Sequence, residues 1–406
     1  MIYLTLPKIY YQDPANYEKI YSERFAAPFT KHLDLNIQQY NRPASYPAFY
    51  CYTEEIANLL VRILHENYLL EKIISELPFV AVKQFYEGSI IEEIQSTNAI
   101  EGVRSTRKEI TTALAKQKST DRSARLWSIV NKYLKLLTKE KIDFKTCTDI
   151  RSFYDDFALD EIKTENPANI PDGLIFRKGS VSISTGTDKT IHKGVYPEPA
   201  LIEALEKALA FLNDENIPLL IRVPVFHYLF GYIHPFYDGN GRTSRFITSY
   251  YLNEELHTII GIRISVNIKK QLKKYYRLFE MTNNEFNRGD LTPFLTEFLE
   301  IILSTIIETQ KLLVKKIDQL ARYEEKLDQK LAALNVTDKL TQDIYYILLQ
   351  AALFKGDGAT VEQLVATTGK SRNTIDARLA ALPKEHLLKI TSTKPYRYKL
   401  NTLMLK

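Results

Sequence analysis

The stretch HPFYDGNGRTSR, from His234 to Arg245, decides how this chain of 406 residues is interpreted. It places a histidine, an aspartate, a Gly-Asn-Gly turn and two arginines between two segments, IRVPVFHYLFGYI and FITSYYLNEEL, that have the pattern of helices. We therefore expect a tight turn that opens a helix, because glycine permits positive φ angles and close approach of the backbone.

The charged groups of this stretch suit a phosphate ligand. Backbone N–H groups in such a turn form an anion-binding nest, and the N-terminus of the next helix adds a positive dipole end. Arg242 and Arg245 lie three residues apart on the first helical turn, and guanidinium groups match phosphate oxygens. Asp238 is a ligand of the kind that Mg²⁺ takes, and His234 is a base with an ordinary pKa of about 6.5. The stretch predicts phosphoryl or nucleotidyl transfer, and the alternative is a plain helix cap with surface ion pairs.

The same stretch matches H-x-F-x-[D/E]-G-N-G-R-x-x-R without a mismatch and thereby resembles the signature of the Fic family. The resemblance implies a helical fold that transfers AMP from ATP to a Ser, Thr or Tyr hydroxyl of a target protein. It implies that His234 deprotonates this hydroxyl, that Asp238 holds Mg²⁺ between the α- and β-phosphates, and that Phe236 anchors the loop. The nucleotide-binding residues that it implies within the motif are Gly239, Asn240, Gly241, Arg242 and Arg245.

A second segment resembles the flap of this family, a β-hairpin before the core helices. It consists of GLIFRKGSVSI followed by GVYPEP, with a turn expected at TGTDK. An incoming target segment can add to such a hairpin as a strand. The resemblance places His192, Lys193 and Gly194 on the flap near the nucleotide, and an ordinary surface hairpin is the alternative.

The segment KKYYRLFEMTNN resembles the helix that closes the adenine pocket. Tyr275 and Asn283 are the candidate contacts, although aromatic residues at helical spacing usually belong to the core. His227 lies two helical turns before His234. We expect it to be a buried, hydrogen-bonded histidine, because no third metal ligand has a suitable spacing.

Residues 96–102, STNAIEG, resemble the inhibitory motif [S/T]-x-x-x-E-[G/N] of self-inhibited family members. Thr97 and Glu101 are i and i+4 on one helix face. The resemblance implies that Glu101 pairs with Arg245, takes the place of the γ-phosphate and leaves ATP in the wrong pose. A plain helix end is the alternative. In some members the same glutamate supports removal of AMP, and this reverse activity stays open.

From Thr337 onward the pattern is helix, helix, helix, hairpin, which resembles a winged helix-turn-helix. This part holds eleven Lys and Arg against six Asp and Glu. The difference of five positive charges equals the net charge of the whole chain. Lys394 and Arg397 are expected on the wing, in contact with phosphate. The groove-facing set for DNA would be Arg372, Asn373, Thr374 and Arg378. Protein docking or homodimerisation is the alternative.

We therefore predict a mainly α fold: a Fic-type helical bundle with a β-hairpin flap, followed by a small winged-helix domain. The predicted divisions are 1–100 for an N-terminal arm and helices, 101–330 for the catalytic domain and 337–406 for the winged helix. Residues 1–53 are expected to be an extended arm with one short helix, and 267–284 one helix. Two cysteines and the absence of a signal-peptide pattern favour a cytoplasmic protein without a membrane partner.

The function predicted from these features is a self-inhibited protein adenylyltransferase that uses ATP and Mg²⁺. A DNA-binding regulator whose Fic domain mainly modifies itself is the second hypothesis. A different transferred group, phosphate or phosphocholine, is the third, and the intact G-N-G-R-x-x-R favours ATP over it.

Overall fold

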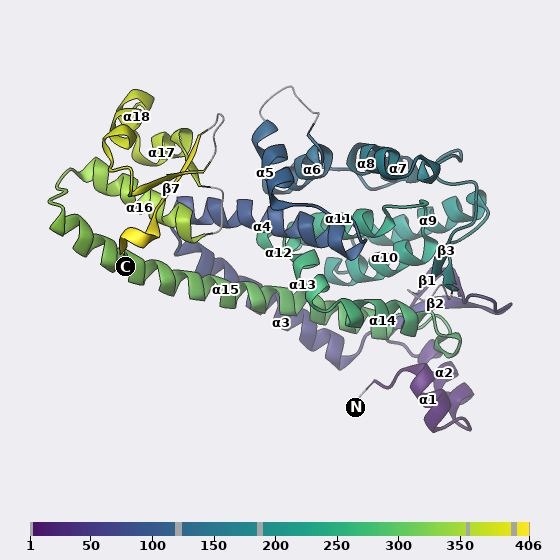
Figure 1. The fold of residues 1–406 in the computed structure, drawn as a ribbon. Coiled ribbons are helices and arrows are strands. Elements are labelled where there is room, and N and C mark those ends of the chain that lie inside the picture. The colour runs from purple at the N-terminus through teal and green to yellow at the C-terminus, as the bar shows by residue number, and fades with distance from the viewer. Residues whose placement is uncertain (1–2, 118–123, 185–189, 355–357, 391–395, 406) are drawn as a thin grey trace.

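The computed structural model describes residues 3–117, 124–184, 190–354, 358–390 and 396–405. These residues are mainly helical (Figure 1), which confirms the predicted fold class at that level. The N-terminal part holds α1 (Leu6–Gln12), α2 (Tyr17–Ala26), β1 (Thr30–Gln38), β2 (Ser45–Cys51), α3 (Glu54–Ser75) and α4 (Phe79–Ile100). The C-terminal part holds α16 (Lys339–Leu353), β5 (Ala359–Thr360), α17 (Val361–Thr368), α18 (Arg372–Ala381), β6 (Leu387–Lys389) and β7 (Arg397–Leu400).

The central part carries the motif. Its elements are α5 (Arg107–Lys116), α6 (Trp127–Leu137), α7 (Cys147–Phe157), α8 (Leu159–Glu165), β3 (Ser182–Ser184), β4 (Thr190–Lys193), α9 (Glu198–Leu212), α10 (Leu219–Ile233), α11 (Asn240–Glu255), α12 (Thr258–Gly261), α13 (Ile264–Lys270), α14 (Leu272–Thr282) and α15 (Thr292–Ala333). Helix α10 is apolar on nearly all sides and is buried almost throughout, as such a helix must be. It packs against α9, α11 and α15, so the motif loop between α10 and α11 starts from the centre of the bundle.

The first 53 residues differ from the predicted extended arm. They form two helices and an antiparallel hairpin of β1 and β2, with Thr30 opposite Cys51 and Gln38 opposite Ser45. Leu33, Leu35 and Ile37 are buried at alternate positions of β1. This two-residue period is the signal of a half-buried strand, and it was present in the sequence.

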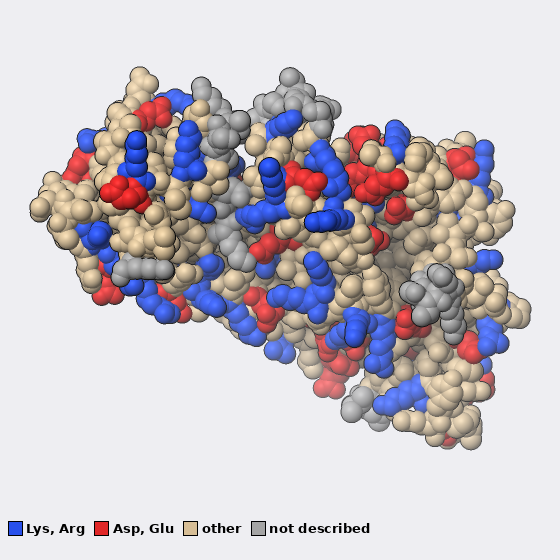
Figure 2. Space-filling view, in the orientation of Figure 1, with Lys and Arg blue, Asp and Glu red and all other residues tan. Residues whose placement is uncertain are grey.

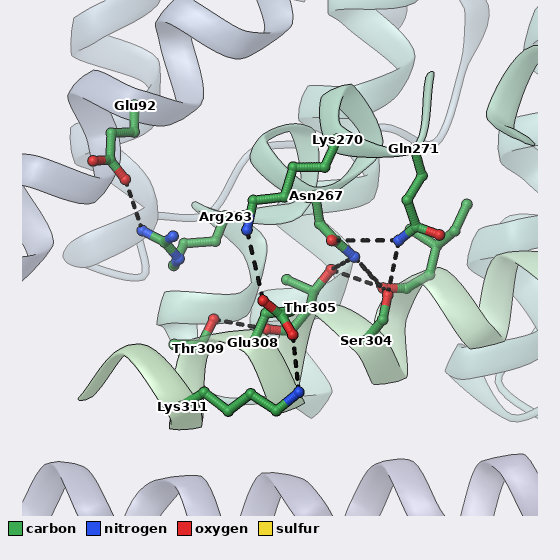
Figure 3. Close-up of polar contacts among 11 residues, drawn as sticks. Glu92, Arg263, Asn267, Lys270, Gln271, Ser304, Thr305, Glu308, Thr309 and Lys311 are labelled. Carbon is green, nitrogen blue, oxygen red and sulfur yellow. Dashed lines mark hydrogen bonds and ion pairs between the residues drawn. The ribbon is translucent and has the colours of Figure 1, made fainter. Parts of the chain in front are cut away.

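The single helix predicted for 267–284 is divided into α13 and α14. The chain leaves helical geometry at Gln271, where φ is −114° and ψ is 30°. The Gln271 side chain donates to Ser304 Oγ of α15 at 3.2 Å, and Asn267 Nδ2 donates to the same oxygen at 2.6 Å (Figure 3). These contacts with α15 explain why the helix is interrupted at Gln271, although the local sequence pattern predicts one continuous helix.

Helix α4 is held at three successive levels. Near its start, Gln84 Nε2 donates to Gly358 O at 3.2 Å, and Glu87 pairs with Arg397 of β7 at 2.9 Å. In its middle, Glu92 pairs with Arg263 at 3.1 Å, as Figure 3 shows. Its last turn reaches the motif, as described below.

The C-terminal elements sit at the far end of the long helix α15 (Figure 1) and pack on α15 and α4 through α16. Their order is the predicted one, with an additional short strand β5, and the sheet order is β5-β7-β6. The turn predicted at TGTDK and the predicted wing residue Lys394 lie outside the described residues. In the described part of the chain, none of the helices combines the length and apolar character that crossing a bilayer requires.

Candidate functional site

His234 ends α10 and adopts a left-handed backbone conformation, with φ 55° and ψ 64°. Its backbone N–H donates to Phe230 O at 2.9 Å. Burial, together with the nearby His192 and Arg177, lowers the pKa of the imidazole to about 4. His234 is therefore neutral at pH 7 and able to accept a proton.

The motif loop is closed by its own asparagine. Asn240 is buried, accepts a hydrogen bond from Phe236 N at 2.9 Å and donates to Phe236 O at 2.8 Å. The ring of Phe236 stacks on Tyr154 of α7 with centroids 3.6 Å apart, which agrees with its predicted anchoring role. Gly239 takes φ 78° immediately before α11, a conformation that glycine adopts without strain. In this arrangement the Asn240 side chain shapes the loop.

The two motif arginines are both buried but point to different helices. Arg242 Nη1 pairs with Glu161 of α8 at 2.9 Å, and its Nη2 lies 3.9 Å from Asp238 Oδ1. The sequence analysis did not single out Glu161. It lies 81 positions before Arg242 and belongs to no recognisable pattern, so only the tertiary fold could identify it.

Arg245 is held by the end of α4. Its Nη2 donates to Glu101 Oε1 at 2.7 Å and to Thr97 O at 3.0 Å, and its Nε donates to Thr97 Oγ1 at 2.9 Å. Burial alone would lower the pKa of Arg245, but the neighbouring Glu101 carboxylate outweighs it and the pKa is raised. Glu101, which was predicted to pair with Arg245, lies against it, and Thr97, for which no such contact was predicted, also binds it.

A cavity of about 1000 Å³ adjoins the motif. The predicted site residues that line it are His192, His234, Asn240, Gly241, Arg245, Tyr275, Asn283 and Glu101. Gly239, Arg242, Lys193, Gly194 and Thr97 do not line it, and Asp238 lines a neighbouring cavity of about 570 Å³ together with Glu101. The structure therefore gathers most of the predicted residues at one place, with Glu101 at the wall between the two cavities.

The two residues predicted to contact adenine form hydrogen bonds within the protein core. The Tyr275 hydroxyl lies 2.8 Å from Nε2 of His227, and Asn283 Oδ1 accepts from Tyr228 OH at 2.7 Å. His227 is buried and also lies 2.8 Å from Thr248 Oγ1, so it is the hydrogen-bonded core histidine that was predicted. Tyr276 is more exposed and lines the same cavity, and its hydroxyl donates to Ile100 O at 3.0 Å.

The residues predicted for the flap lie against the end of α10 and the motif histidine. His192 is buried and its Nε2 lies 2.6 Å from Tyr232 O, and burial lowers its pKa. Lys193 is exposed, with its Nζ 6.0 Å from the Tyr40 ring centre. At Gly194 a Cβ atom would lie 3.0 Å from the Cβ of His234, so the flap backbone and the motif histidine lie against each other.

The residues present fit a magnesium ion held with the help of substrate. Within the described residues no three or more His, Cys, Asp or Glu side chains form a metal-binding group. Asp238 supplies one partly exposed carboxylate at the motif, and Mg²⁺ commonly binds one or two carboxylates plus substrate phosphates. Asp238 would hold the ion, and the ion would neutralise part of the negative charge on the substrate phosphates.

The residues predicted to contact DNA lie on α18 and β7. Arg372, Asn373 and Thr374 are exposed at the start of α18, which Ser371 caps through a 3.2 Å bond from Thr374 N. Arg372 pairs with Glu362 at 2.8 Å and Arg378 with Asp338 at 3.5 Å. On the face shown in Figure 2, Lys and Arg alternate with Asp and Glu over this module and form no continuous basic area.

Arg397 does not occupy the exposed wing position predicted for it. Its guanidinium is mostly buried against Glu87 of α4. Arg397 therefore forms an intramolecular ion pair with α4 and is not directed outward as the sequence predicted. Lys394 lies outside the described residues.

The class of this region follows from comparison with known proteins. Residues 152–252 match the model of the Fic/DOC family, a range that includes the complete motif. The chain thus contains a Fic/DOC domain. A crystal structure of a Fic family protein from Desulfovibrio desulfuricans G20 has the same fold, with a TM-score of 0.50 and 19% identity over 87% of this chain and 97% of that one.

Two proteins that are similar to this chain in sequence carry the name protein adenylyltransferase Fic. The chain is 31% identical over 130 residues to the one from Drosophila erecta, covering 30% of this chain and 24% of that protein. It is 30% identical over 130 residues to the one from Drosophila melanogaster, covering 30% and 25%. The matched segment thus spans about a quarter of the length of these relatives.

Proposed function

We propose that the protein is a protein adenylyltransferase that transfers AMP from ATP to a hydroxyl of a target protein. One observation carries the proposal: His234, neutral and at the end of α10, lines a cavity with Asn240, Gly241 and Arg245 at the start of α11. A base is thereby next to a helix N-terminus that suits phosphate. The names of the relatives add support for ATP as the donor.

In the proposed reaction, the His234 imidazole accepts the proton of the acceptor hydroxyl. The hydroxyl oxygen then attacks the α-phosphorus, and the bond from this phosphorus to the bridging oxygen breaks, so that pyrophosphate leaves. The N–H groups at the start of α11 and the guanidinium of Arg245 would hold the phosphates in line. A Mg²⁺ ion at Asp238 would neutralise part of the charge of the departing pyrophosphate.

We further propose that the enzyme is self-inhibited through Glu101. The Nε and Nη2 groups of Arg245 are engaged by Thr97 of α4 and by Glu101, which caps this helix. Gly241 also lies against this carboxylate, since a Cβ there would lie 2.1 Å from Glu101 Oε1. Glu101 thus occupies space at the phosphate end of the cavity, and ATP that binds beside it lacks Arg245 for its terminal phosphate.

The test uses ATP labelled separately at the α- and γ-phosphates, with purified Glu101→Gly protein and cell lysate. Label from the α position alone on protein supports adenylylation, whereas label from γ alone would show phosphate transfer and overturn the proposal. His234→Ala in the same background should lose roughly 10²–10⁴ in rate and keep its ATP affinity by calorimetry. Loss of AMP from pre-labelled protein in the parent, but not in Glu101→Gly, would show the reverse activity.

A second candidate function, DNA binding, concerns the C-terminal elements. The observation in its favour is that Arg372, Asn373 and Thr374 are exposed to solvent in the first turn of α18. Helices that read the major groove contact bases with their N-terminal residues. A fluorescence anisotropy titration with random duplex DNA at low salt tests it, and the absence of any binding would leave protein docking or dimerisation as the role of this module.

A further inference from the structure

Arg177, which the sequence analysis did not single out, is completely buried between the flap and the motif loop. Its Nε donates to His234 O at 3.0 Å, its Nη1 to Gly179 O at 2.7 Å and its Nη2 to Val195 O at 2.9 Å. Among the described residues, no carboxylate forms an ion pair with it. A buried charge is tolerated only when its hydrogen-bonding groups are satisfied, and here backbone carbonyls satisfy them.

These three acceptors come from three different parts of the site, and a longer fourth bond joins Nη2 to Ile233 O at 3.5 Å, next to His234. Gly179 lies just before β3, Val195 lies just after β4, and His234 opens the motif. One planar guanidinium thus joins both ends of the flap hairpin to the catalytic histidine. Two backbone hydrogen bonds follow the same path, from Gly194 N to Val181 O and from Val195 N to Ile233 O, each at 3.0 Å.

The backbone of His234 needs such support. A residue with a Cβ atom is disfavoured at φ 55°, and it persists there only where its surroundings hold it. The Arg177 bond goes to the carbonyl of His234 itself, on the side opposite to the bond from His234 N to Phe230 O. Both peptide groups of His234 are therefore held, and the direction of its side chain follows from them.

We propose that Arg177 is a positioning residue that fixes the flap relative to His234, so that an acceptor hydroxyl carried along the flap meets the imidazole. This inference rests on the proposed transfer reaction. Arginine is required because its planar group carries five donors in fixed directions, whereas a lysine ammonium is a point charge on a flexible stem. Nucleotide binding uses α11 and Arg245 instead and is independent of Arg177.

The experiment compares Arg177→Met and Arg177→Lys in the Glu101→Gly background. The matched control is Arg222→Met, because Arg222 Nη1 likewise donates to one backbone carbonyl, Leu212 O at 2.7 Å, but near the other end of α10. We expect Arg177→Met to lower kcat for AMP transfer about 10²-fold, as a small misplacement of reacting groups does. The ATP affinity of Arg177→Met, measured by calorimetry, should equal that of the Glu101→Gly background. The kcat of Arg177→Lys should lie between that of Arg177→Met and that of the background. The kcat of Arg222→Met should equal that of the background.

Hydrogen exchange gives a second measurement that does not require activity. Backbone amides of residues 179–184, 190–195 and 233–237 should exchange faster in Arg177→Met than in Arg222→Met, and those of α11 should not. Transfer at the background rate by Arg177→Met, or unchanged exchange in these segments, overturns the proposal; so does a parallel loss of ATP affinity. If Arg177→Met does not fold, Arg177→Lys decides by the same criteria. If the Glu101→Gly background labels nothing, the proposed function fails, and the exchange data alone decide whether Arg177 joins flap and motif.

Discussion

Arg245 and Glu101 are separated by 144 positions in the chain, yet Arg245 Nη2 donates to Glu101 Oε1 at 2.7 Å. The contact is reinforced by two bonds from Arg245 to Thr97, one helical turn earlier on α4. The residue that caps α4 therefore holds an arginine of α11 that lines the cavity beside the motif.

Replacing Glu101 by glycine should release this arginine. A hydrogen bond between charged groups contributes about 1.5–3 kcal/mol, so we expect AMP transfer to rise roughly 10- to 100-fold. Intact-mass spectrometry after incubation with ATP and Mg²⁺ measures it as added AMP on the protein itself. Glu92→Gln is the matched control, because Glu92 lies on the same helix but pairs with Arg263. Equal labelling of parent and Glu101→Gly would show that Glu101 is not inhibitory.

Replacing Asp238 by asparagine should remove the magnesium dependence of ATP binding. Asp238 is the only carboxylate within the motif, and asparagine keeps its shape without the charge that a divalent cation requires. ATP affinity measured by calorimetry at several magnesium concentrations should no longer increase with the metal. Asp156→Asn, an exposed aspartate paired with Lys132, should behave like the parent. Overlapping magnesium curves for Asp238→Asn and the parent would contradict the assignment.

The site was partly predictable because its central part is local in sequence. His234, Asp238, Gly239 and Arg245 belong to one continuous stretch, so their types and spacing are enough to predict a phosphate-binding turn. Glu161 and Arg177 were missed because each acts through a contact between residues 57 or more positions apart. Arg177 is a single arginine within IFRKG and belongs to no spacing pattern, so the sequence gives no sign of its contact with His234.

The fold was predictable to a similar degree. Capping boxes at Thr106 and Thr360 begin α5 and α17, and such helix starts can be recognised in a sequence because the cap is made by residues three positions apart. The β1 strand was missed although Leu33, Leu35 and Ile37 alternate with polar residues. The break at Gln271 was not predictable, because it depends on Ser304 of another helix.

The buried His227 should make the protein less stable in acid. Burial lowers the pKa of His227 to about 3, whereas an unfolded histidine titrates at about 6.5. Between these values the unfolded chain binds a proton that the native state does not, so the free energy of unfolding falls by about 1.4 kcal/mol for each unit of decreasing pH. Above pH 6.5 the unfolded histidine is also neutral, so the contribution of His227 to the free energy of unfolding is fully present there.

Urea unfolding at pH 7, 6 and 5 measures this loss. His227→Gln, which keeps a hydrogen-bonding side chain without titrating, should show a smaller decrease than the parent across this range. His65→Gln on α3 is the control, because it replaces a histidine that lies on the exposed side of its helix. An equal decrease for the parent and His227→Gln would show that His227 does not cause the acid sensitivity.

If the C-terminal module binds DNA, reversing two charges on α18 should weaken it. Arg372 and Arg378 are exposed and pair with Glu362 and Asp338, and exposed ion pairs are weak enough to yield to phosphate. Arg372→Glu with Arg378→Glu should lower affinity for duplex DNA and reduce the salt slope by about one for each lost phosphate contact. Fluorescence anisotropy at several salt concentrations measures both. Binding by the double variant that equals the parent at low salt would remove α18 from any DNA interface.

Arg397 should affect stability rather than DNA binding, because the structure pairs it with Glu87 of α4 at 2.9 Å in a mostly buried position. Arg397→Glu sets two carboxylates against each other between β7 and α4 and should lower the free energy of unfolding by about 1–3 kcal/mol. Chemical denaturation measures this loss, and the charge-swapped pair Glu87→Arg with Arg397→Glu should recover a large part of it. The recovery identifies the pair itself as the cause, since each single change also alters packing. A parent-like stability of Arg397→Glu, together with a loss of DNA affinity, would instead return Arg397 to the exposed wing that the sequence predicted.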